Sequence, residues 1–269
     1  MAVGAIGAAR ANLVATNKSL GQHWLTDRSI LSEIAEAANL TKDDTVLEIG
    51  PGLGTLTSAL LKQAKAVVAV EFDEELARKL PGQFPGTALT VTYEDILQYD
   101  LSSLPSGYKV VANVPYYITS KIVEKLMTAE NKPSVAVLLV QKEVAERIAA
   151  KPGDMSLLGL SAQMFAEATL GGHVPRHYFT PPPKVDSQVV ILKTHSEPLI
   201  PKADEKAFFR VAKAGFGAKR KMLRSSIAGG LGISKPAAEE LLKHANINPD
   251  ARAQDLSIAD WQRLAKDAV

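Results

Sequence analysis

The sequence of 269 residues contains no cysteine. This absence excludes disulfide bonds, thiolate metal ligands and a cysteine nucleophile, and it fits a reducing, cytoplasmic compartment. The five histidines show no spacing typical of metal ligands, so we predict no metal site. Whatever chemistry this chain performs must therefore come from its amides, carboxylates, aromatic rings and basic side chains.

Long hydrophobic runs are also absent. No apolar stretch approaches the roughly 18 residues that a membrane-spanning helix needs, so we expect no membrane segment. The first residues, Met1 to Ala15, are small and apolar, but Arg10 and Asn12 interrupt them in a way that does not fit a secretory signal. We expect residues 1–16 to form a flexible lead-in.

Charge is nearly balanced, and a formal net charge of +2 does not by itself indicate a nucleic-acid partner. From Ile200 onward, however, there are 13 Lys/Arg and 8 Asp/Glu, a net of +5, which leaves −3 for the rest of the chain. The densest basic cluster consists of Lys219, Arg220, Lys221 and Arg224. It is either a phosphate-binding surface or a solvated helix face.

Short apolar runs alternate with helix-like patterns over the first two thirds of the chain. The predicted strands are Thr45–Ile49, Ala66–Val70, Leu89–Thr92, Val110–Ala112, Val135–Val140 and Val189–Leu192. Helical spacing occurs between them, for example at Ile30–Ala38 and Thr55–Gln63. This alternation predicts an α/β fold with a doubly wound, mostly parallel sheet over residues 17–195.

Beyond a proline-containing linker, His195–Pro201, only helical patterns remain. The predicted helices are Asp204–Ala214, Lys219–Ile227, Lys235–His244 and Ser257–Lys266. We therefore predict a small all-helical domain over residues 202–269, and its basic cluster makes RNA binding its expected role.

A glycine-rich loop follows the first strand of the sheet. Gly50, Gly52 and Gly54 lie between Val46–Ile49 and a helix, and Glu71 ends the next strand, 21 residues after Gly50. Such a loop lets a ligand approach the backbone, and the carboxylate can accept from both hydroxyls of a ribose. A dinucleotide site has the form Gly-x-Gly-x-x-Gly, and the third glycine of this loop, Gly54, is misplaced for that form.

The form Glu-x-Gly-x-Gly-x-Gly better resembles S-adenosylmethionine methyltransferases, in which no phosphate must be bound. Asp95, after the third strand, could accept from the adenine amine of that cofactor, with Ile96 against the ring. The alternative is a glycine-rich turn flanked by surface acids.

The sequence Asn113-Val114-Pro115-Tyr116 ends the fourth strand of the predicted series. Asparagine offers a carbonyl to an amine, proline fixes the local backbone so that a neighbouring carbonyl can point the same way, and tyrosine offers a face for stacking. Together these groups suit a planar base with an exocyclic amine. The competing interpretation is a strand end with a turn proline and a half-buried tyrosine.

In this order, the motifs resemble N6-adenine rRNA methyltransferases, and the resemblance covers about Asn17 to Lys266. Other segments resemble the small-subunit rRNA adenine dimethyltransferases in particular. They are Leu20–Leu25, Leu139–Val144, the triple-proline segment Phe179–Ser187, the group Phe216, Lys219, Arg220, Lys221, Leu223 and Arg224, and the group Arg252, Ala253 and Leu256. The chain departs from that family at Trp24, Tyr117 and Gly217-Ala218.

The resemblance implies a Rossmann-like methyltransferase that uses S-adenosylmethionine to dimethylate two adjacent adenosines in the 3′-terminal hairpin loop of 16S rRNA, during small-subunit biogenesis. Asn113 and the Val114 carbonyl would orient N6, while Tyr116 and Phe179 would sandwich the base, with Pro115 fixing the turn. The expected cofactor-binding residues are His23, Leu25, Gly50, Gly52, Glu71, Asp95, Ile96 and Asn113. The partner would be the 30S pre-ribosomal particle, bound by a monomer through Lys219, Arg220, Lys221 and Arg224.

Two alternatives remain at this point. The first is an Erm-type methyltransferase of 23S rRNA, against which the segment Pro181-Pro182-Pro183 weighs. The second is a non-catalytic RNA-binding assembly or transcription factor on the same fold, against which the intact Glu71, Asp95, Asn113 and Tyr116 weigh.

Overall fold

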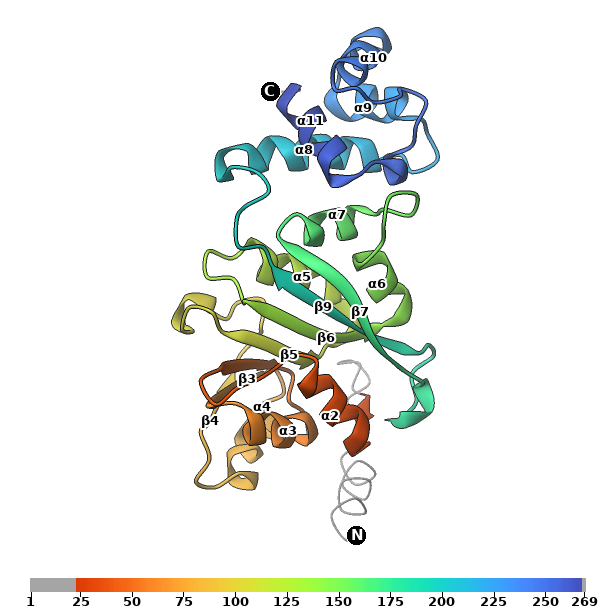
Figure 1. Cartoon of the computed structure of the whole chain (residues 1–269). Coiled ribbons are helices and arrows are strands. Elements are labelled where there is room, and N and C mark those ends of the chain that lie inside the picture. Colours follow the sequence, from red (N-terminus) through yellow and green to blue (C-terminus); the bar gives the residue numbers. More distant parts are fainter. Residues whose placement is uncertain (1–22, 268–269) are drawn as a thin grey trace. The chain divides into compact units, whose positions relative to one another are not determined.

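The computed structural model describes residues 23–267 and contains a seven-stranded sheet (Figure 1). The strand order is β4-β3-β2-β5-β6-β9-β7. The strands are β2 (Thr45–Ile49), β3 (Ala66–Glu71), β4 (Leu89–Tyr93), β5 (Lys109–Asn113), β6 (Val135–Gln141), β7 (Ala166–Val174) and β9 (Ser187–Thr194). The neighbours from β4 to β6 pair in parallel, and β9 pairs antiparallel with β6. This arrangement confirms the predicted α/β class with a mostly parallel sheet.

Helices and short 3-10 turns connect these strands. They are α2 (Arg28–Glu36), α3 (Thr55–Gln63), α4 (Glu74–Lys79), η2 (Pro81–Gln83), η3 (Leu101–Ser103), η4 (Tyr116–Ile118), α5 (Thr119–Thr128), α6 (Lys142–Ile148), α7 (Leu157–Gln163) and η5 (Arg176–Tyr178). A separate antiparallel ribbon joins β1 (Trp24–Leu25) to β8 (Phe179–Thr180).

The central strands are built from apolar residues that are buried on both faces. Val110, Val111 and Ala112 of β5 have no exposed surface, and the same holds for the middle of β6, from Ala136 to Val140. Continuous apolar runs of this kind are expected where helices cover both sides of a parallel sheet. The strand order reverses between β2 and β5, and ligands of such folds bind at the carboxyl ends of the strands there.

One strand of the sheet, β7, was not predicted. Its segment Ala166–Val174 contains two adjacent glycines, and apolar and polar residues do not alternate regularly along it. Most of its residues are partly or fully exposed, so no apolar face marks the strand in the sequence. At Gly171 a Cβ atom would lie 2.9 Å from Val189, so the glycine permits β7 to approach β9 closely. The edge strand is therefore specified by its neighbour more than by its own side chains.

The chain divides into two compact units, and each is described by itself. The first comprises residues up to Ala145 together with Glu167–Thr194, and the second comprises Glu146–Ala166 together with the chain from His195 onward. The second unit contains η6 (Lys202–Asp204), α8 (Glu205–Phe216), α9 (Leu223–Leu231), α10 (Lys235–His244), η7 (Ala253–Asp255) and α11 (Ile258–Asp267). Among the described residues, no helix combines the length and the apolar character needed to cross a membrane.

The segment Glu146–Ala166 joins the C-terminal helices through hydrogen bonds and apolar packing. The amides of Gly153 and Met155 donate to the Gln254 carbonyl at 2.9 and 3.2 Å. Met155, Leu160 and Met164 lie in the same apolar cluster as the C-terminal helices. The compact helical unit thus includes more of the chain than residues 202–269, while an independent RNA-binding domain stays a prediction. The predicted lead-in, residues 1–16, lies outside the described residues, as do Leu20 to Gln22.

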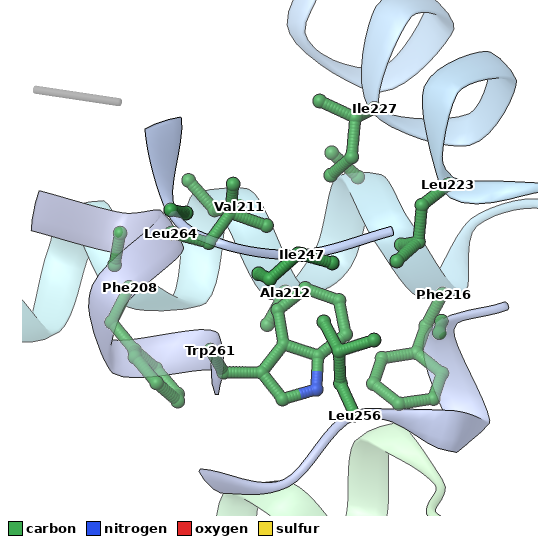
Figure 2. Packing of buried hydrophobic residues seen from close by; sticks show 14 of the residues in the cluster. Phe208, Val211, Ala212, Phe216, Leu223, Ile227, Ile247, Leu256, Trp261 and Leu264 are labelled. Atoms are coloured by element: carbon green, nitrogen blue, oxygen red, sulfur yellow. The ribbon is translucent and has the colours of Figure 1, made fainter. Parts of the chain in front are cut away.

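Figure 2 shows the core of the helical unit, which is centred on Trp261 of α11. Its ring stacks on Phe216 of α8, with centroids 5.3 Å apart and planes inclined by 26°. Phe208, Leu223 and Ile227 complete a core that contacts α8, α9 and α11. Burial of large aromatic and aliphatic side chains is the main force that holds short helices together.

The predicted helix Lys219–Ile227 is wrong at its start. Helix α9 begins only at Leu223, and Lys219 to Lys221 lie in an exposed turn after α8. The reason is tertiary, because the amides of Leu223 and Arg224 donate to the carbonyls of Ala251 and Pro249, at 2.8 and 3.1 Å. The basic residues therefore occupy a loop between two helices and not a helix face.

The adjacent glycines of α9 offer a matched test of this packing. A Cβ at Gly230 would lie 2.4 Å from the Ala214 Cβ of α8, whereas a Cβ at Gly229 would meet nothing within 4 Å. We expect Gly230→Ala to lower the free energy of unfolding by about 1–3 kcal/mol through overpacking. Gly229→Ala should instead raise it by about 0.5–1 kcal/mol, since alanine favours helix.

Chemical denaturation followed by tryptophan fluorescence measures both values. The chain has two tryptophans, so a Trp24→Phe background leaves Trp261 as the reporter of the helical unit. Equal stabilities of the two alanine variants would contradict the close approach of α8 and α9.

Candidate functional site

A pocket opens at the carboxyl ends of β2 and β5, in the unit that contains the sheet. Its lining brings together segments that are far apart in sequence: His23, Trp24, Leu25, Leu31, Glu48, Gly50, Pro51, Gly52, Leu53, Thr55, Leu56, Glu71, Phe72, Asn113, Val114, Pro115, Tyr116 and Tyr117. The glycine loop, the acid that ends β3 and the tetrad Asn113 to Tyr116 therefore form one site. This is the crevice that the reversal of strand order creates.

The glycine loop connects β2 to α3 through backbone that favours glycine. Gly50, Gly52 and Gly54 all have positive φ angles, and Gly54 caps α3 in the left-handed conformation. At Gly52 a Cβ would lie 2.5 Å from the Trp24 ring. The loop backbone and the Trp24 ring thus pack directly on each other, so this departure from the resembled family forms part of the pocket wall.

Glu71 ties the end of β3 to the glycine loop. Its side chain accepts a hydrogen bond from the Gly52 amide at 3.0 Å and another from the Asp73 amide at 2.9 Å. The residue is only 7 % exposed, and this burial raises the pKa of the Glu71 carboxyl above its usual range. A carboxylate offers about four acceptor positions, so these amides leave acceptor capacity for a ligand in the pocket.

Glu48 is a second buried acid in the pocket wall, and it was not among the predicted site residues. One oxygen accepts from the Thr57 hydroxyl at 2.6 Å, while the other, Oε1, is buried and has no hydrogen-bond partner among residues 23–267. Burial raises the pKa of Glu48 to about 8, and the nearby Glu71 charge adds to the effect. The sequence did carry a signal, because a charged residue interrupts the apolar strand Val46–Ile49.

The indole nitrogen Nε1 of Trp24 is likewise buried, and no group in the described part of the chain pairs with it. Trp24 and Glu48 line the same pocket, so its wall holds one unpartnered donor and one unpartnered acceptor. Buried polar groups without partners are costly and uncommon in folded proteins. Their presence here is the expected signature of a pocket that binds a polar ligand.

The tetrad lies where β5 ends. Asn113 is the last residue of the strand, and the Val114 amide donates to the Leu139 carbonyl of β6 at 3.1 Å. Pro115, with φ of −57°, then turns the chain into η4. The tetrad is therefore held from both sides, by the proline and by the neighbouring strand.

Tyr116 is fixed by two contacts that sequence reasoning missed. Its hydroxyl lies 2.6 Å from the Ser187 hydroxyl at the start of β9, and its ring stacks on His23, with centroids 5.9 Å apart. Burial raises the pKa of the Tyr116 phenol above its ordinary value. His23 in turn lies 2.7 Å, through Nδ1, from the Pro181 carbonyl. No spacing rule connects these partners, because they lie 71 and 93 residues from Tyr116 in the sequence.

Phe179 does not line the pocket. It pairs with Leu25 across the β1–β8 ribbon, is only 2 % exposed, and belongs to a core cluster that includes Leu31 and Ile34. The ring that faces Tyr116 in this structure is His23. The stacking role of Phe179 stays a prediction, and it requires that the side chain turn out of the core.

Asp95 and Ile96 follow β4 at the same edge of the sheet but do not contribute to the pocket lining. One carboxylate oxygen of Asp95 accepts from the Leu97 amide at 2.9 Å, and Ile96 is buried. Their predicted contact with an adenine ring also stays a prediction.

The basic cluster of the helical unit separates into two kinds of residue. Lys219, Arg220 and Lys221 are exposed in the turn before α9, whereas Arg224 lies 2.7 Å from Asp250 and 3.7 Å from Glu239. Two carboxylates thus offset the charge of Arg224. Within residues 23–267, no group of three or more histidine or acidic side chains is placed to hold a metal ion.

Replacing Glu48 by Gln tests the buried acid through pH. The pKa of Glu48 is about 8 in the fold against an ordinary value of 4.5, so the folded protein keeps a proton that the unfolded chain loses. The stability that neutral Glu48 contributes is complete below pH 4.5 and is lost as the pH rises to about 8. We expect wild type to lose on the order of 1–4 kcal/mol relative to Glu48→Gln across this window.

Denaturant titrations at pH 5 and pH 8 measure this difference. Glu143→Gln, which removes an exposed carboxyl from α6, is the matched control and should follow wild type. If the free energy of unfolding changes between pH 5 and pH 8 by the same amount in Glu48→Gln as in wild type, Glu48 is ionised in the folded protein over that whole range.

Comparison with known proteins assigns the family. A family model described as ribosomal RNA adenine dimethylase matches residues 14–268. The chain is 44% identical over 256 residues to the ribosomal RNA small subunit methyltransferase A of Dehalococcoides mccartyi (strain CBDB1), covering 92% of this chain and 86% of that protein. It is 40% identical over 272 residues to the protein of the same name from Nostoc sp. (strain PCC 7120 / SAG 25.82 / UTEX 2576), covering 94% and 98%.

Solved structures agree with the fold. A dimethyladenosine transferase from Plasmodium falciparum aligns with a TM-score of 0.77 and 28% identity, over 90% of this chain and 96% of that one. The 23S rRNA methyltransferase ErmE aligns with a TM-score of 0.73 and 29% identity, over 91% and 99%. By the match of the family model and of these relatives, the chain belongs to the ribosomal RNA adenine dimethylase family.

Proposed function

We propose that this protein uses S-adenosylmethionine to dimethylate N6 of two adjacent adenosines in the 3′-terminal hairpin loop of 16S rRNA, as a step in small-subunit biogenesis. The observation that carries the proposal is that the glycine loop, Glu71 and the tetrad Asn113 to Tyr116 line one pocket. A site for the methyl donor and a site for an amine-bearing base would thus share a wall.

The pocket residues fit the cofactor. Glu71 would accept from the ribose hydroxyls, and Gly50 and Gly52 would let the ligand approach the loop backbone. The unpartnered Glu48 Oε1 and Trp24 Nε1 offer an acceptor and a donor, which suit the ammonium and carboxylate groups of a methionine moiety. His23 and Leu25 would contact the same moiety, Asn113 would line the cofactor side, and Asp95 with Ile96 would approach the adenine. When bound, S-adenosylmethionine supplies an electrophilic methyl group on a sulfonium.

The tetrad would orient the nucleophile. The lone pair of adenine N6 is delocalised into the ring, so the protein must favour a pyramidal nitrogen. Asn113 Oδ1 and the Val114 carbonyl would accept hydrogen bonds from the N6 amine and direct its lone pair at the methyl group. This is catalysis by positioning and electrostatics, and each transfer exchanges one N6 proton for one methyl group.

Tyr116 would hold the base by stacking. Its hydrogen bond to Ser187 would fix the orientation of the ring against the π-face of adenine. In this structure the His23 ring occupies one face of Tyr116, so the base would take the other face or displace the imidazole. Stacking contributes about 1–3 kcal/mol per base.

The alternatives are weaker. Relatives that are 37–44% identical to the chain carry the small-subunit name, whereas the identity to ErmE is 29%. A non-catalytic factor would have no need for two unpartnered polar atoms in the wall of a pocket beside Glu71.

Methylation of purified ribosomal subunits tests the proposal. We expect labelled S-adenosylmethionine to modify 30S subunits from cells that lack the modification, and mass spectrometry of nucleosides to identify N6,N6-dimethyladenosine. Asn113→Ala should keep some affinity for the cofactor but lose at least about 100-fold in transfer, the usual effect of removing one such polar contact. Gln98→Ala, which removes an exposed amide of the same unit, is the control.

Modification of 23S rRNA alone would overturn the substrate assignment. Near-normal turnover by Asn113→Ala would overturn the role of its amide.

The exposed basic turn Lys219–Lys221 predicts RNA binding by the helical unit. Replacing Lys219, Arg220 and Lys221 together by alanine removes exposed charges, so we expect weaker binding to 30S subunits. The slope of log K against log salt concentration should also become shallower, by about one for each lost phosphate contact. The triple variant of Lys235, Lys243 and Lys266 removes the same charge from exposed positions of the same unit. If both variants lose affinity equally, net charge and not this turn explains binding.

A further inference from the structure

A second cavity lies in the sheet-containing unit and has no part in the proposed chemistry. It is an open groove of about 510 Å³, within the range of about 300–1,000 Å³ that small-molecule sites occupy. Its lining includes Thr26, Arg28, Ser29, His177, Tyr178 and Thr180. The groove is large enough for one nucleotide.

The groove borders the pocket across the β1–β8 ribbon. Trp24 and Leu25 of β1 line the pocket, and the next residues, from Thr26 to Ser29, line the groove. On the other strand, Thr180 pairs with Trp24 and also lines the groove. The short β1–β8 ribbon therefore contributes residues to both cavities.

The chemistry of the groove suits a nucleotide. Tyr178 is 38 % exposed although it is a large aromatic residue, and its ring packs on His177 with centroids 4.4 Å apart. Such a supported ring offers a rigid face to a base. Arg28 is exposed at the start of α2 and can meet a phosphate, while the hydroxyls of Thr26, Ser29 and Thr180 can hydrogen bond to sugar or base.

The groove also contains one acid, Asp27. Its Oδ1 accepts from the amides of Ser29 and Ile30 at 3.0 and 3.1 Å, because it caps α2. The carboxylate is thus engaged by the helix terminus, and Arg28 supplies the positive charge of the groove.

We propose that the groove binds the neighbour of the adenosine in the pocket, with its base stacked on Tyr178 and its phosphate near Arg28. The inference rests on the proposed function, since it needs an RNA substrate in the pocket. It extends that function because a second adenosine held beside the first is the next one to be modified. Arg28 and Tyr178 both lie outside the lining of the pocket, so their replacement tests the groove by itself.

A fluorescent RNA tests this directly. The probe is a hairpin with two adjacent loop adenosines, in which 2-aminopurine replaces first one adenosine and then the other. We expect one of these probes to be quenched on binding to wild type. Tyr178→Ala should remove that quenching, while Tyr178→Phe, which keeps a stacking face, should retain it.

Kinetics with the unmodified hairpin give an independent readout. We expect Tyr178→Ala to raise KM for RNA by about 5-fold to about 150-fold, the range that loss of one stacked base gives, with the Kd for S-adenosylmethionine unchanged. Arg28→Gln should raise the KM for RNA and reduce the salt dependence of that KM. Arg28→Lys should bring the KM and its salt dependence most of the way back to the wild-type values. Tyr93→Ala removes another exposed tyrosine ring, one that lies outside both cavities, and should behave as wild type.

These measurements separate failure of the groove proposal from failure of the proposed function. If wild type transfers no methyl group to hairpin or 30S subunit, the proposed function fails, whatever the fluorescence shows. If wild type is active but Tyr178→Ala retains both quenching and KM, the groove proposal alone is overturned. Loss of affinity for 30S subunits with unchanged binding of the hairpin would also overturn it, since the groove would then contact a ribosomal protein.

Discussion

The hydrogen bond from the Gly52 amide to the Glu71 carboxylate is the interaction on which the site depends. It joins the end of β3 to the loop after β2, and it orients the loop backbone beside the tetrad that ends β5. Burying a carboxylate is unfavourable unless hydrogen bonds compensate, and Glu71 receives them from the amides of Gly52 and Asp73. A strand end, a loop and a helix start are thereby held together by one side chain.

The second buried acid shows why the pocket is not simply a packed core. Glu48 has one satisfied and one unsatisfied oxygen, and it stands near the charge of Glu71. A neutral Glu48 reduces the repulsion that two buried carboxylates would otherwise experience. The arrangement leaves the fold less stable than an apolar wall would, which is common where a protein holds polar groups ready for a ligand.

Sequence reasoning predicted the parts of the fold that rest on local patterns. The bounds of β2, α3 and α10 agree with the sequence prediction, because apolar runs, glycines and capping residues specify them locally. The same reasoning missed β7, in which apolar and polar side chains do not alternate regularly. It also extended α9 into the turn at Lys219. Contacts with Val189 in one case, and with the Ala251 and Pro249 carbonyls in the other, decided these elements.

The site was predictable to a similar extent. Residues at the carboxyl ends of strands, such as Glu71 and Asn113, could be placed in one crevice from the order of the motifs in the sequence. Partners that arrive from distant segments, such as Ser187 and His23 on Tyr116, could not, because no periodicity links them. The burial of Phe179 likewise follows from its pairing with Leu25, which only the folded chain shows.

The interleaving of the two units has a consequence for synthesis on the ribosome. The segment Glu146–Ala166 leaves the exit tunnel before β7 and β9, yet its apolar residues Met155, Leu160 and Met164 pack with helices made later. Until β9 emerges, β6 also lacks its antiparallel neighbour. The first unit can therefore be completed once β9 has emerged, whereas the segment Glu146–Ala166 must wait for the helices that are made last.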